Sequence, residues 1–215
     1  MPVELIIFDL DGTLIDSIRD ITNALNYVMR PFSTATLVPE EVEGMIGEGA
    51  QKLVQKVLEK CRLSLPIEPL VKQYTERYAS HLTECTTLYS DVAETLAGLA
   101  DYRMALVSNK TQLLSRRILD VFGLSRHFEA VVCADTIPQR KPSPEPLLYV
   151  LSTLRVPVAH AVMVGDSEID IMAGKACSMR TVAVTHGYGK PGFEEEADFA
   201  IDGLPPLIPL VKSLA

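Results

Sequence analysis

The sequence predicts an α/β protein: a central parallel sheet flanked by helices, with an all-helical segment inserted near the N-terminus. Short apolar runs rich in Val and Ile alternate with helix-length segments, and such runs are typical of parallel strands that are buried on both faces. Residues 16–86 contain no convincing strand. At 215 residues the chain is long enough for one full domain and a smaller satellite.

The apolar runs predict strands at residues 4–8, 103–107, 130–133, 161–164 and 181–184. Helices are expected between the later strands, at residues 110–122, 145–154 and 168–177. Pro144 and Pro146 stand where the second of these helices would begin, and proline is well tolerated in a first helical turn. This alternation of strand and helix predicts a Rossmann-like core.

Within residues 16–86 the apolar positions follow helical spacing instead. They fall into three groups: Ile18, Ile21, Leu25, Val28 and Met29; Leu53, Val57 and Leu58; and Leu70, Val71, Tyr74 and Tyr78. Ordinary crossover connections are much shorter, which disfavours helices that simply cover the sheet. We therefore expect a core of residues 1–15 and 87–215 and a helical domain of residues 16–86, with hinges near residues 14–17 and 82–90.

Charge and composition disfavour several classes of partner. The net charge is −8, with no block of Lys or Arg, so we expect no nucleic acid and no membrane as partner. No apolar run approaches the roughly 18 to 20 residues of a membrane span, and the N-terminus lacks the pattern of a signal peptide. The four cysteines are scattered without a C-x-x-C pair. We expect a cytoplasmic protein with free thiols, either a monomer or a homodimer.

Polar side chains follow four of the expected strands. In an open α/β sheet, ligands bind beyond the carboxyl ends of the strands, so these side chains should meet at one edge. They are Asp9 and Asp11; Ser108, Asn109 and Lys110; Asp135 and Lys141; and Asp166, Ser167 and Asp170. Among them, Asp135 is expected to be an ordinary polar loop residue.

Asp9 and Asp11 are two residues apart at the end of a strand, so their side chains start out on the same face. Two carboxylates held that close are costly unless a positive group joins them, and the simpler alternative is a solvated acidic turn. The downstream polar residues favour a site for phosphoryl transfer. Asp9 would be the nucleophile that attacks phosphorus, and Asp11 would protonate the leaving alcohol and then take a proton from water.

A magnesium ion would neutralise these carboxylates. Asp166 and Asp170, with Asp9, offer the hard oxygen ligands that Mg2+ prefers. The metal would let an anionic nucleophile meet an anionic phosphate. The structural alternative is that Asp166 and Asp170 only form an acidic helix start, which the helix dipole favours. Asp170 could also bond to a residue that binds the metal, without binding the metal itself.

Further positions are candidates for binding phosphate. Ser108 and the backbone amides of the following helix can hold phosphate oxygens, and Lys141 offers a charge beside the transferring group. Thr13 offers a hydroxyl near the nucleophile. Asn109 is a candidate phosphate contact or a helix cap, and the role of Lys110 is left open.

Four segments resemble the four ordered motifs of the haloacid dehalogenase superfamily: FDLDGTLID, VSNK, RKPSPEP and VGDSEIDI. Residues 16–86 match the position of that family's type-one cap. Two further stretches, EEVEGMIGEGAQKLV and VTHGYGKPGFEEEADFAID, resemble the phosphoglycolate phosphatase group. The resemblance implies Mg2+-dependent hydrolysis of a small phosphomonoester, 2-phosphoglycolate, between cap and core. It also implies that the backbone carbonyl of Asp11 is a metal ligand.

The resemblance further implies that the loop at residues 47–49 faces the substrate, with Gly49 in the loop and Lys52 as an anion contact. The alternative is a flexible turn between helices. Residues 187–192 formally fit G-x-G-x-x-G, but the acidic run at residues 194–196 would repel a pyrophosphate and Pro191 would interrupt the helix start. We therefore reject this segment as a nucleotide-binding loop.

Alternative activities remain open within the same superfamily. A pyrophosphatase, a sugar-phosphate phosphatase or a phosphomutase would use the same core chemistry on another substrate. A binding module without catalysis would have lost some of the acidic residues or the lysine. Asp9, Asp11, Lys141 and Asp166 are all present, which disfavours that interpretation.

Overall fold

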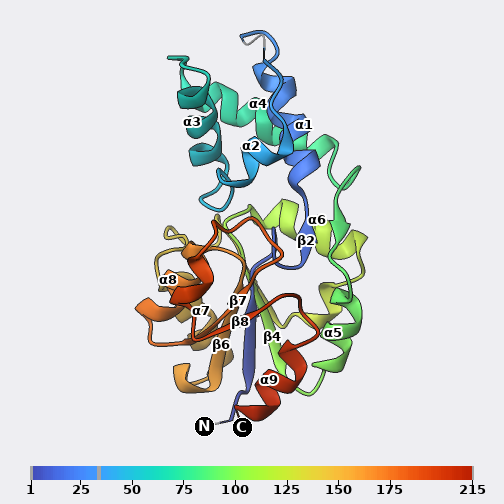
Figure 1. Cartoon of the computed structure of the whole chain (residues 1–215), viewed down its shortest axis with the longest axis vertical. Coiled ribbons are helices and arrows are strands. Elements are labelled where there is room, and N and C mark those ends of the chain that lie inside the picture. The colour runs from blue at the N-terminus through green and yellow to red at the C-terminus, as the bar shows by residue number, and fades with distance from the viewer. Residues whose placement is uncertain (1, 33–34, 215) are drawn as a thin grey trace.

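The structure of the protein is a computed structural model that describes residues 2–32 and 35–214. Within these residues, six parallel strands form one sheet in the order β5-β4-β1-β6-β7-β8 (Figure 1). The strands are β1 (Leu5–Phe8), β4 (Arg103–Val107), β5 (Ala130–Val132), β6 (Ala161–Gly165), β7 (Arg180–Val184) and β8 (Phe199–Ile201). The expected α/β class and parallel sheet are confirmed.

Helices flank this sheet and also build the inserted segment. The α-helices are α1 (Ile18–Met29), α2 (Pro39–Glu43), α3 (Ala50–Lys60), α4 (Ile67–Ser80), α5 (Val92–Gly98), α6 (Gln112–Val121), α7 (Glu145–Leu154), α8 (Glu168–Ala176) and α9 (Leu207–Ser213). Short 3-10 turns lie at Ser125–His127, Val158–His160 and Phe193–Glu196. The prediction for residues 145–154 is confirmed at both ends, and α6 begins two residues later than expected.

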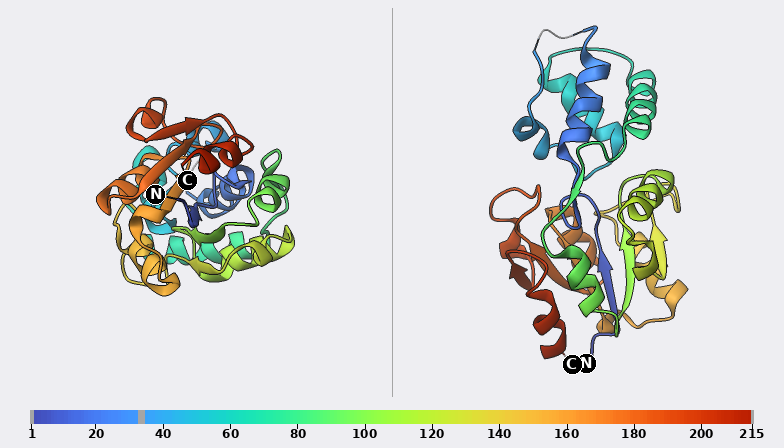
Figure 2. Two further views of the ribbon diagram at one scale, coloured as in Figure 1. Left: turned by 90° about the horizontal axis from the view of Figure 1, so that it is seen from below. Right: turned by 90° about the vertical axis from the view of Figure 1, so that its right-hand side faces the viewer.

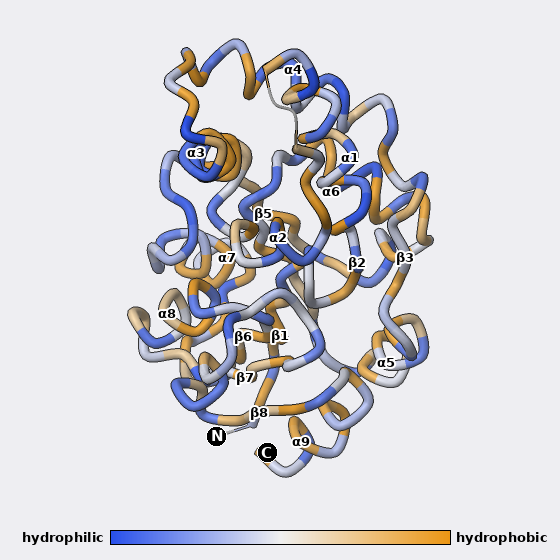
Figure 3. The backbone as a smooth tube through the Cα atoms, turned by 45° about the horizontal axis from the view of Figure 1, so that its top comes forward, coloured by the Kyte–Doolittle hydropathy of each residue, from blue (hydrophilic) through white to orange (hydrophobic). Residues whose placement is uncertain are grey.

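Both faces of the sheet are buried, as the apolar strands require. Successive side chains of a strand point to opposite faces. In β1, Ile6 and Phe8 therefore pack with α5, α6 and α9 on one face, while Leu5 and Ile7 pack with α7 and α8 on the other. Figure 3 shows the hydrophobic residues of β1 in the middle of the molecule. This double layer fixes the strand ends, and the polar residues that follow them share one edge.

The helical segment α1–α4 forms a separate layer beyond that edge of the sheet (Figure 2). Its helices pack on a hydrophobic cluster of their own, which is built largely from the apolar positions with helical spacing. Leu25 of α1, Val57 of α3 and Tyr78 of α4 are among its buried members. The segment is thus held together by its own packing and not only by contact with the sheet.

The chain enters and leaves this helical segment through two paired strands. β2 (Ile15–Asp16) and β3 (Thr87–Leu88) form an antiparallel pair, with Ile15 opposite Leu88 and Asp16 opposite Thr87. The expectation of no strand in residues 16–86 is therefore wrong at Asp16. A two-residue strand carries no periodicity that a sequence pattern could reveal. In the described part of the chain, no helix is long and apolar enough to cross a membrane.

Candidate active site

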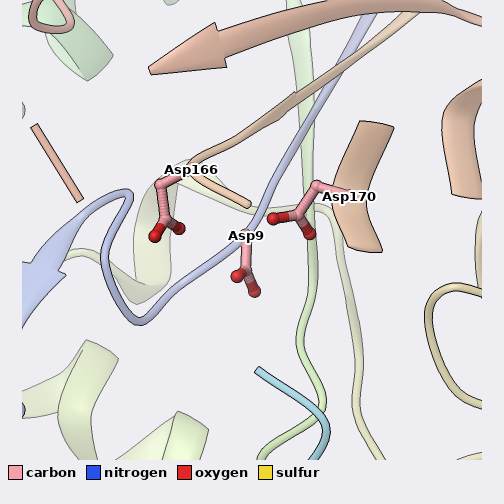
Figure 4. A group of neighbouring side chains, drawn as sticks. All are labelled: Asp9, Asp166 and Asp170. Carbon is pink, nitrogen blue, oxygen red and sulfur yellow. The ribbon is translucent and has the colours of Figure 1, made fainter. Parts of the chain in front are cut away.

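The carboxyl ends of the central strands bring the predicted acidic residues together. Asp9 follows β1, Asp166 follows β6, and Asp170 lies in the first turn of α8. Each offers a carboxylate oxygen, and these oxygens lie within 4.8 Å of one another (Figure 4). All are buried, with relative exposures of 7%, 2% and 0%. The structure therefore creates a concentrated negative site inside the protein.

Lys141 reaches into this cluster from the loop before α7. Its Nζ atom lies 2.8 Å from Oδ1 of Asp9 and 2.7 Å from Oδ1 of Asp170. Burial alone would lower the pKa of Lys141, but Asp170 and Asp9 raise it overall. The ammonium group is therefore held in its charged form between two carboxylates.

The acidic cluster remains incompletely neutralised by the protein. Burial raises the pKa of Asp9 to about 7, with repulsion from Asp170 adding to the shift and Lys141 opposing it. Burial also raises the pKa of Asp166, and Asp170 and Asp9 reinforce this. Both shifts record the cost of placing like charges together out of water. A bound cation would remove that cost.

Asp170 is held on both of its oxygens. Oδ1 accepts from Lys141, and Oδ2 accepts from the hydroxyl of Ser167 at 2.7 Å and from its backbone N–H at 3.2 Å. This arrangement completes a capping box at the start of α8. Asp170 therefore orients Lys141 and α8 in addition to lying beside Asp9 and Asp166.

Thr13 bonds to the acidic cluster. Its hydroxyl donates to Oδ1 of Asp166 at 2.8 Å, and the side chain is fully buried. The other oxygen, Oδ2, accepts from the backbone N–H of Tyr188 at 2.8 Å. Thr13 thus orients Asp166, and its contact with phosphate stays a prediction.

Asp11 lies beside a second buried lysine. Oδ1 of Asp11 accepts from the hydroxyl of Ser17 at 2.5 Å and is 2.8 Å from Nζ of Lys110. The same Nζ donates to the hydroxyl of Tyr78 on α4 at 2.8 Å. Burial would lower the pKa of Lys110, but the charge of Asp11 raises it overall. Lys110, whose role was open from the sequence, therefore forms an ion pair with Asp11 and a hydrogen bond to the helical segment through Tyr78.

A cavity of about 240 Å3 lies between the sheet edge and the helical segment. Asp9, Asp11 and Ser108 line it from the sheet side, together with Lys110. The helical side contributes mainly apolar groups and the loop before α3: Ile21, Ile46, Gly47, Gly49, Ala50, Gln51, Leu53, Val71, Tyr74, Thr75 and Tyr78. The structure thus brings Asp9, Asp11, Ser108, Asn109 and Gly49 to one cavity.

Lys52 does not reach this cavity. In α3 the buried face carries Leu53, Val54 and Val57, and Lys52 is exposed outside that face. A helix turns by about 100° per residue, so Gln51 and Leu53 can line the cavity while Lys52 points elsewhere. Its contact with an anion stays a prediction that this cavity does not support.

Asn109 is used by the protein itself. Its Oδ1 accepts from the backbone N–H of Lys141 at 3.0 Å, and its Nδ2 donates to the carbonyl of Lys141 and to that of Gly47, both at 2.8 Å. The two amide hydrogens are thereby both engaged. Asn109 fixes the Lys141 loop, contacts the helical segment and also lines the cavity, so its contact with phosphate stays a prediction. Asp135 is a capping residue, since it accepts from the N–H of Gln112 at the start of α6.

Three contributors to the site were missed from the sequence: Tyr74, Tyr78 and Arg140. The rings of Tyr74 and Tyr78 stack at a centroid distance of 5.9 Å, and Arg140 lines the cavity from the loop before Lys141. The two tyrosines had been recognised as helical core positions. Their four-residue spacing did not indicate that the hydroxyl of Tyr78 would accept a hydrogen bond from Lys110.

The donor set fits a divalent cation. Four carboxylates, on Asp9, Asp11, Asp166 and Asp170, face two ammonium groups, on Lys110 and Lys141. When all four carboxylates are ionised, their negative charge exceeds the charge of the two ammonium groups by two, which one divalent ion would balance. Clustered carboxylate oxygens are the donors that hard cations prefer. The raised pKa of Asp9 and of Asp166 agrees with a site that is built for a cation.

The parallel core, the helical insertion and the acidic cluster with its buried lysine are the parts of a phosphoryl-transfer enzyme. The sequence profile of the haloacid dehalogenase-like hydrolases matches residues 6–184. The chain therefore belongs to the haloacid dehalogenase-like hydrolase family.

Individual relatives agree with this assignment. Phosphoglycolate phosphatase 1 of Pseudomonas aeruginosa is 36% identical over 221 aligned positions, covering 98% of this chain and 80% of that protein. Phosphoglycolate phosphatase of Aquifex aeolicus is 37% identical over 191 positions, covering 87% of each. A crystal structure of a predicted phosphoglycolate phosphatase from Haemophilus somnus matches with a TM-score of 0.89 at 27% identity, with 97% of both chains covered. The chain is a phosphoric monoester hydrolase that resembles the phosphoglycolate phosphatases.

Proposed function

We propose that this enzyme hydrolyses 2-phosphoglycolate to glycolate and phosphate with Mg2+, through a phosphorylated Asp9. The observation that carries the proposal is that Asp9 and Asp11 line one small cavity together with the ammonium group of Lys110. The identity to proteins named phosphoglycolate phosphatase supports the choice of substrate.

Asp9 is the nucleophile in this proposal. One carboxylate oxygen forms a bond to phosphorus while the bond from phosphorus to the glycolate oxygen breaks. Lys141, 2.8 Å from Asp9, offsets negative charge as it gathers on the transferring group. Ser108 lies at the end of β4 and lines the cavity, where its hydroxyl can hold a phosphate oxygen.

Asp11 is the general acid and base. In its protonated form it gives its proton to the leaving oxygen of glycolate. It then takes a proton from the water that attacks phosphorus, and the bond between phosphorus and Asp9 breaks to release phosphate. The hydroxyl of Ser17, 2.5 Å away, fixes the orientation of the Asp11 carboxylate for both steps.

Asp9, Asp166 and Asp170 would hold Mg2+, with the backbone carbonyl of Asp11 as a further ligand implied by the family resemblance. When bound, the ion supplies charge neutralisation between the nucleophile and the phosphate. Because Asp170 already accepts hydrogen bonds on both oxygens, we expect it to contribute more through Lys141 than through direct ligation.

The helical segment selects the leaving group in this proposal. We propose that residues 16–86 act as a cap on a core of residues 1–15 and 87–215. A cavity of about 240 Å3 suits a small ester, and the stacked rings of Tyr74 and Tyr78 limit its width. Lys110 lies beside Asp11 at the point where the carboxylate of glycolate would sit.

The test is phosphate release from a panel of substrates by the purified enzyme with Mg2+. We expect 2-phosphoglycolate to exceed pyrophosphate and sugar phosphates by at least about a hundredfold in kcat/KM, or about 2.7 kcal/mol of transition-state preference. Asp9→Asn and EDTA serve as controls. A faster pyrophosphate or sugar phosphate would replace the proposed substrate, and transfer to a second hydroxyl without free phosphate would indicate a phosphomutase.

A further inference from the structure

The turn after β7, at residues 185–189, packs tightly against Asp166. A Cβ atom on Gly187 would lie 2.3 Å from Cβ of Asp166, and one on Gly189 would lie 2.1 Å from its carbonyl oxygen. Real Cβ atoms essentially never approach that closely, so both positions require glycine. The close approach lets the backbone N–H of Tyr188, between the two glycines, donate to Oδ2 of Asp166 at 2.8 Å.

The side chain of Tyr188 extends from this turn to the first connection of the helical segment. Its hydroxyl donates to Oδ1 of Asp16 at 2.8 Å and accepts from the backbone N–H groups of Ser17 at 2.7 Å and Ile18 at 3.1 Å. A tyrosine hydroxyl has one hydrogen to donate and two acceptor positions, so all of them are engaged. One residue thus contacts the acidic cluster through its backbone and the start of α1 through its ring.

The contact lies at an unusual cap on α1. Ser17 occupies the N-cap position, where a serine hydroxyl normally accepts from the first backbone N–H groups of its own helix. Here the hydroxyl of Ser17 makes no such bond and donates to Asp11. The hydroxyl of Tyr188 accepts from the backbone N–H of Ser17 itself and shares that of Ile18 with Oδ1 of Asp16. Tyr188 thus fixes the backbone of Ser17 at the place where the Ser17 hydroxyl meets Asp11.

The same turn also contacts the second connection. The ring of His186 stacks on Tyr89, which follows β3, at a centroid distance of 4.0 Å. Nε2 of His186 hydrogen-bonds to the carbonyl of Thr13 at 3.1 Å, and the hydroxyl of Thr13 donates to Asp166. Both connections between the sheet and the helical segment thus contact the turn that orients Asp166.

We propose that Tyr188 is a positioning residue that couples the acidic cluster to the helical segment and holds the hydroxyl of Ser17 on Asp11. The effect on turnover rests on the proposed role of Asp11 as general acid and base. The coupling itself does not depend on which phosphate ester is the substrate.

Amide hydrogen exchange tests the coupling directly. Tyr188→Phe removes the hydroxyl and keeps the backbone N–H to Asp166 and both glycines. We expect the amide of Ser17 to exchange at least about tenfold faster in this variant, because its acceptor is gone, whereas the amide of Ile18 keeps Oδ1 of Asp16 as an acceptor. In the wild type, Mg2+ should slow the exchange of the Ser17 amide, and in Tyr188→Phe this response should disappear. Unchanged exchange in the variant, or a full response to Mg2+, would overturn the proposal.

A double-mutant cycle tests the path through Ser17. Tyr188→Phe and Ser17→Ala should each lower kcat about tenfold, equivalent to about 1.4 kcal/mol, with KM within about twofold. The double variant should be no slower than the slower single variant, since both changes break one path. Additive losses in kcat would contradict the inference.

Tyr149→Phe is the matched control, because this tyrosine is exposed on α7. It should leave kcat and the exchange of the Ser17 amide unchanged. If the wild type does not hydrolyse 2-phosphoglycolate, the proposed substrate fails, while the exchange experiment still decides whether Tyr188 couples the two parts.

Discussion

At the scale of single residues, Lys141 connects the stability of the site to its chemistry. Its ammonium group is buried between Asp9 and Asp170 and offsets part of the negative charge of both carboxylates. A buried carboxylate that loses its cation keeps the free-energy cost of desolvation but no longer has the attraction of the ion pair to offset it. The residue proposed to assist phosphoryl transfer therefore also allows the acidic cluster to fold.

Replacing Lys141 with methionine should therefore destabilise the protein as well as inactivate it. We expect Lys141→Met to lower the free energy of unfolding by about 3–5 kcal/mol in metal-free buffer, measured by urea denaturation. Adding Asp170→Asn should restore part of that loss, because one unpaired charge is removed. Lys175→Met, at an exposed lysine of α8, should change stability by less than about 0.5 kcal/mol. A Lys141→Met protein as stable as the wild type would argue against this pairing.

Replacing Asp9 should separate chemistry from folding. Asp9→Asn keeps the shape of the side chain and removes the nucleophilic oxygen, so kcat should fall by more than about 10^3-fold. Mass spectrometry of acid-quenched enzyme should detect a phosphorylated peptide containing Asp9 in the wild type and none in the variant. Asp135→Asn is the control, because Asn can also cap α6 and turnover should stay within about twofold. Substantial turnover by Asp9→Asn would exclude it as nucleophile.

The residue scale also shows which site residues a sequence can reveal. Asp9, Asp11 and Asp166 follow apolar strands, and that pattern predicts where they meet. The structural roles of Thr13 and Asn109 were not predicted, because their polar groups bond to Asp166 and Lys141, which are distant in sequence. A hydroxyl or an amide near a site can serve substrate or protein equally well, and the sequence does not say which.

At the scale of elements, α8 places Asp170 by packing very closely on the sheet. Gly174 of α8 faces Thr181 of β7, and a Cβ atom there would lie 2.5 Å from Cγ2 of Thr181. Gly165, at the end of β6, is equally close to the side chain of Asp170. The position of the helix therefore depends on small residues at the contact.

Enlarging Gly174 should push α8 away from the sheet. We expect Gly174→Ala to lower the free energy of unfolding by about 1–3 kcal/mol, since overpacking forces neighbours to shift. Thermal or urea unfolding measures this. Gly44→Ala is the matched control, because Gly44 has an ordinary negative φ of −68° and no atom within 4 Å of an added Cβ. Equal stability of the two variants would mean that α8 adjusts without cost.

Element prediction succeeded where patterns were long and failed where they were short. The helix at residues 145–154 was predicted correctly at both ends, and Pro144 and Pro146 mark its start. The strand β8 was missed, since Phe199–Ile201 is short and only Ile201 is fully buried. Tyr188 bonds to Ser17 across 171 residues, a relation that no local pattern contains.

At the scale of the whole molecule, the acidic cluster makes folding respond to cations. An ion that binds the folded chain but not the unfolded one stabilises it by mass action. Burial and mutual repulsion raise the pKa of Asp9 and Asp166, so without a cation the folded enzyme bears a cost of ionising these carboxylates that the unfolded chain does not.

Removing the metal should therefore lower the melting temperature. At a Mg2+ concentration about a hundredfold above its Kd, the gain is about 2.7 kcal/mol, which for a chain of this size raises Tm by roughly 5–10 °C over EDTA. Differential scanning calorimetry measures the shift. Asp166→Asn should abolish most of it, whereas Asp198→Asn, remote from the cluster, should retain it. Equal melting with Mg2+ and with EDTA would show that the cluster binds no Mg2+.

The paired strands β2 and β3 have a consequence for how such enzymes can diversify. The helical segment leaves and rejoins the sheet through two adjacent residue pairs, Ile15 with Leu88 and Asp16 with Thr87. A segment attached at one narrow point can be exchanged as a cassette during evolution, or in the laboratory, without rethreading the strands beneath it. New substrates can then be acquired above a reaction centre that stays the same.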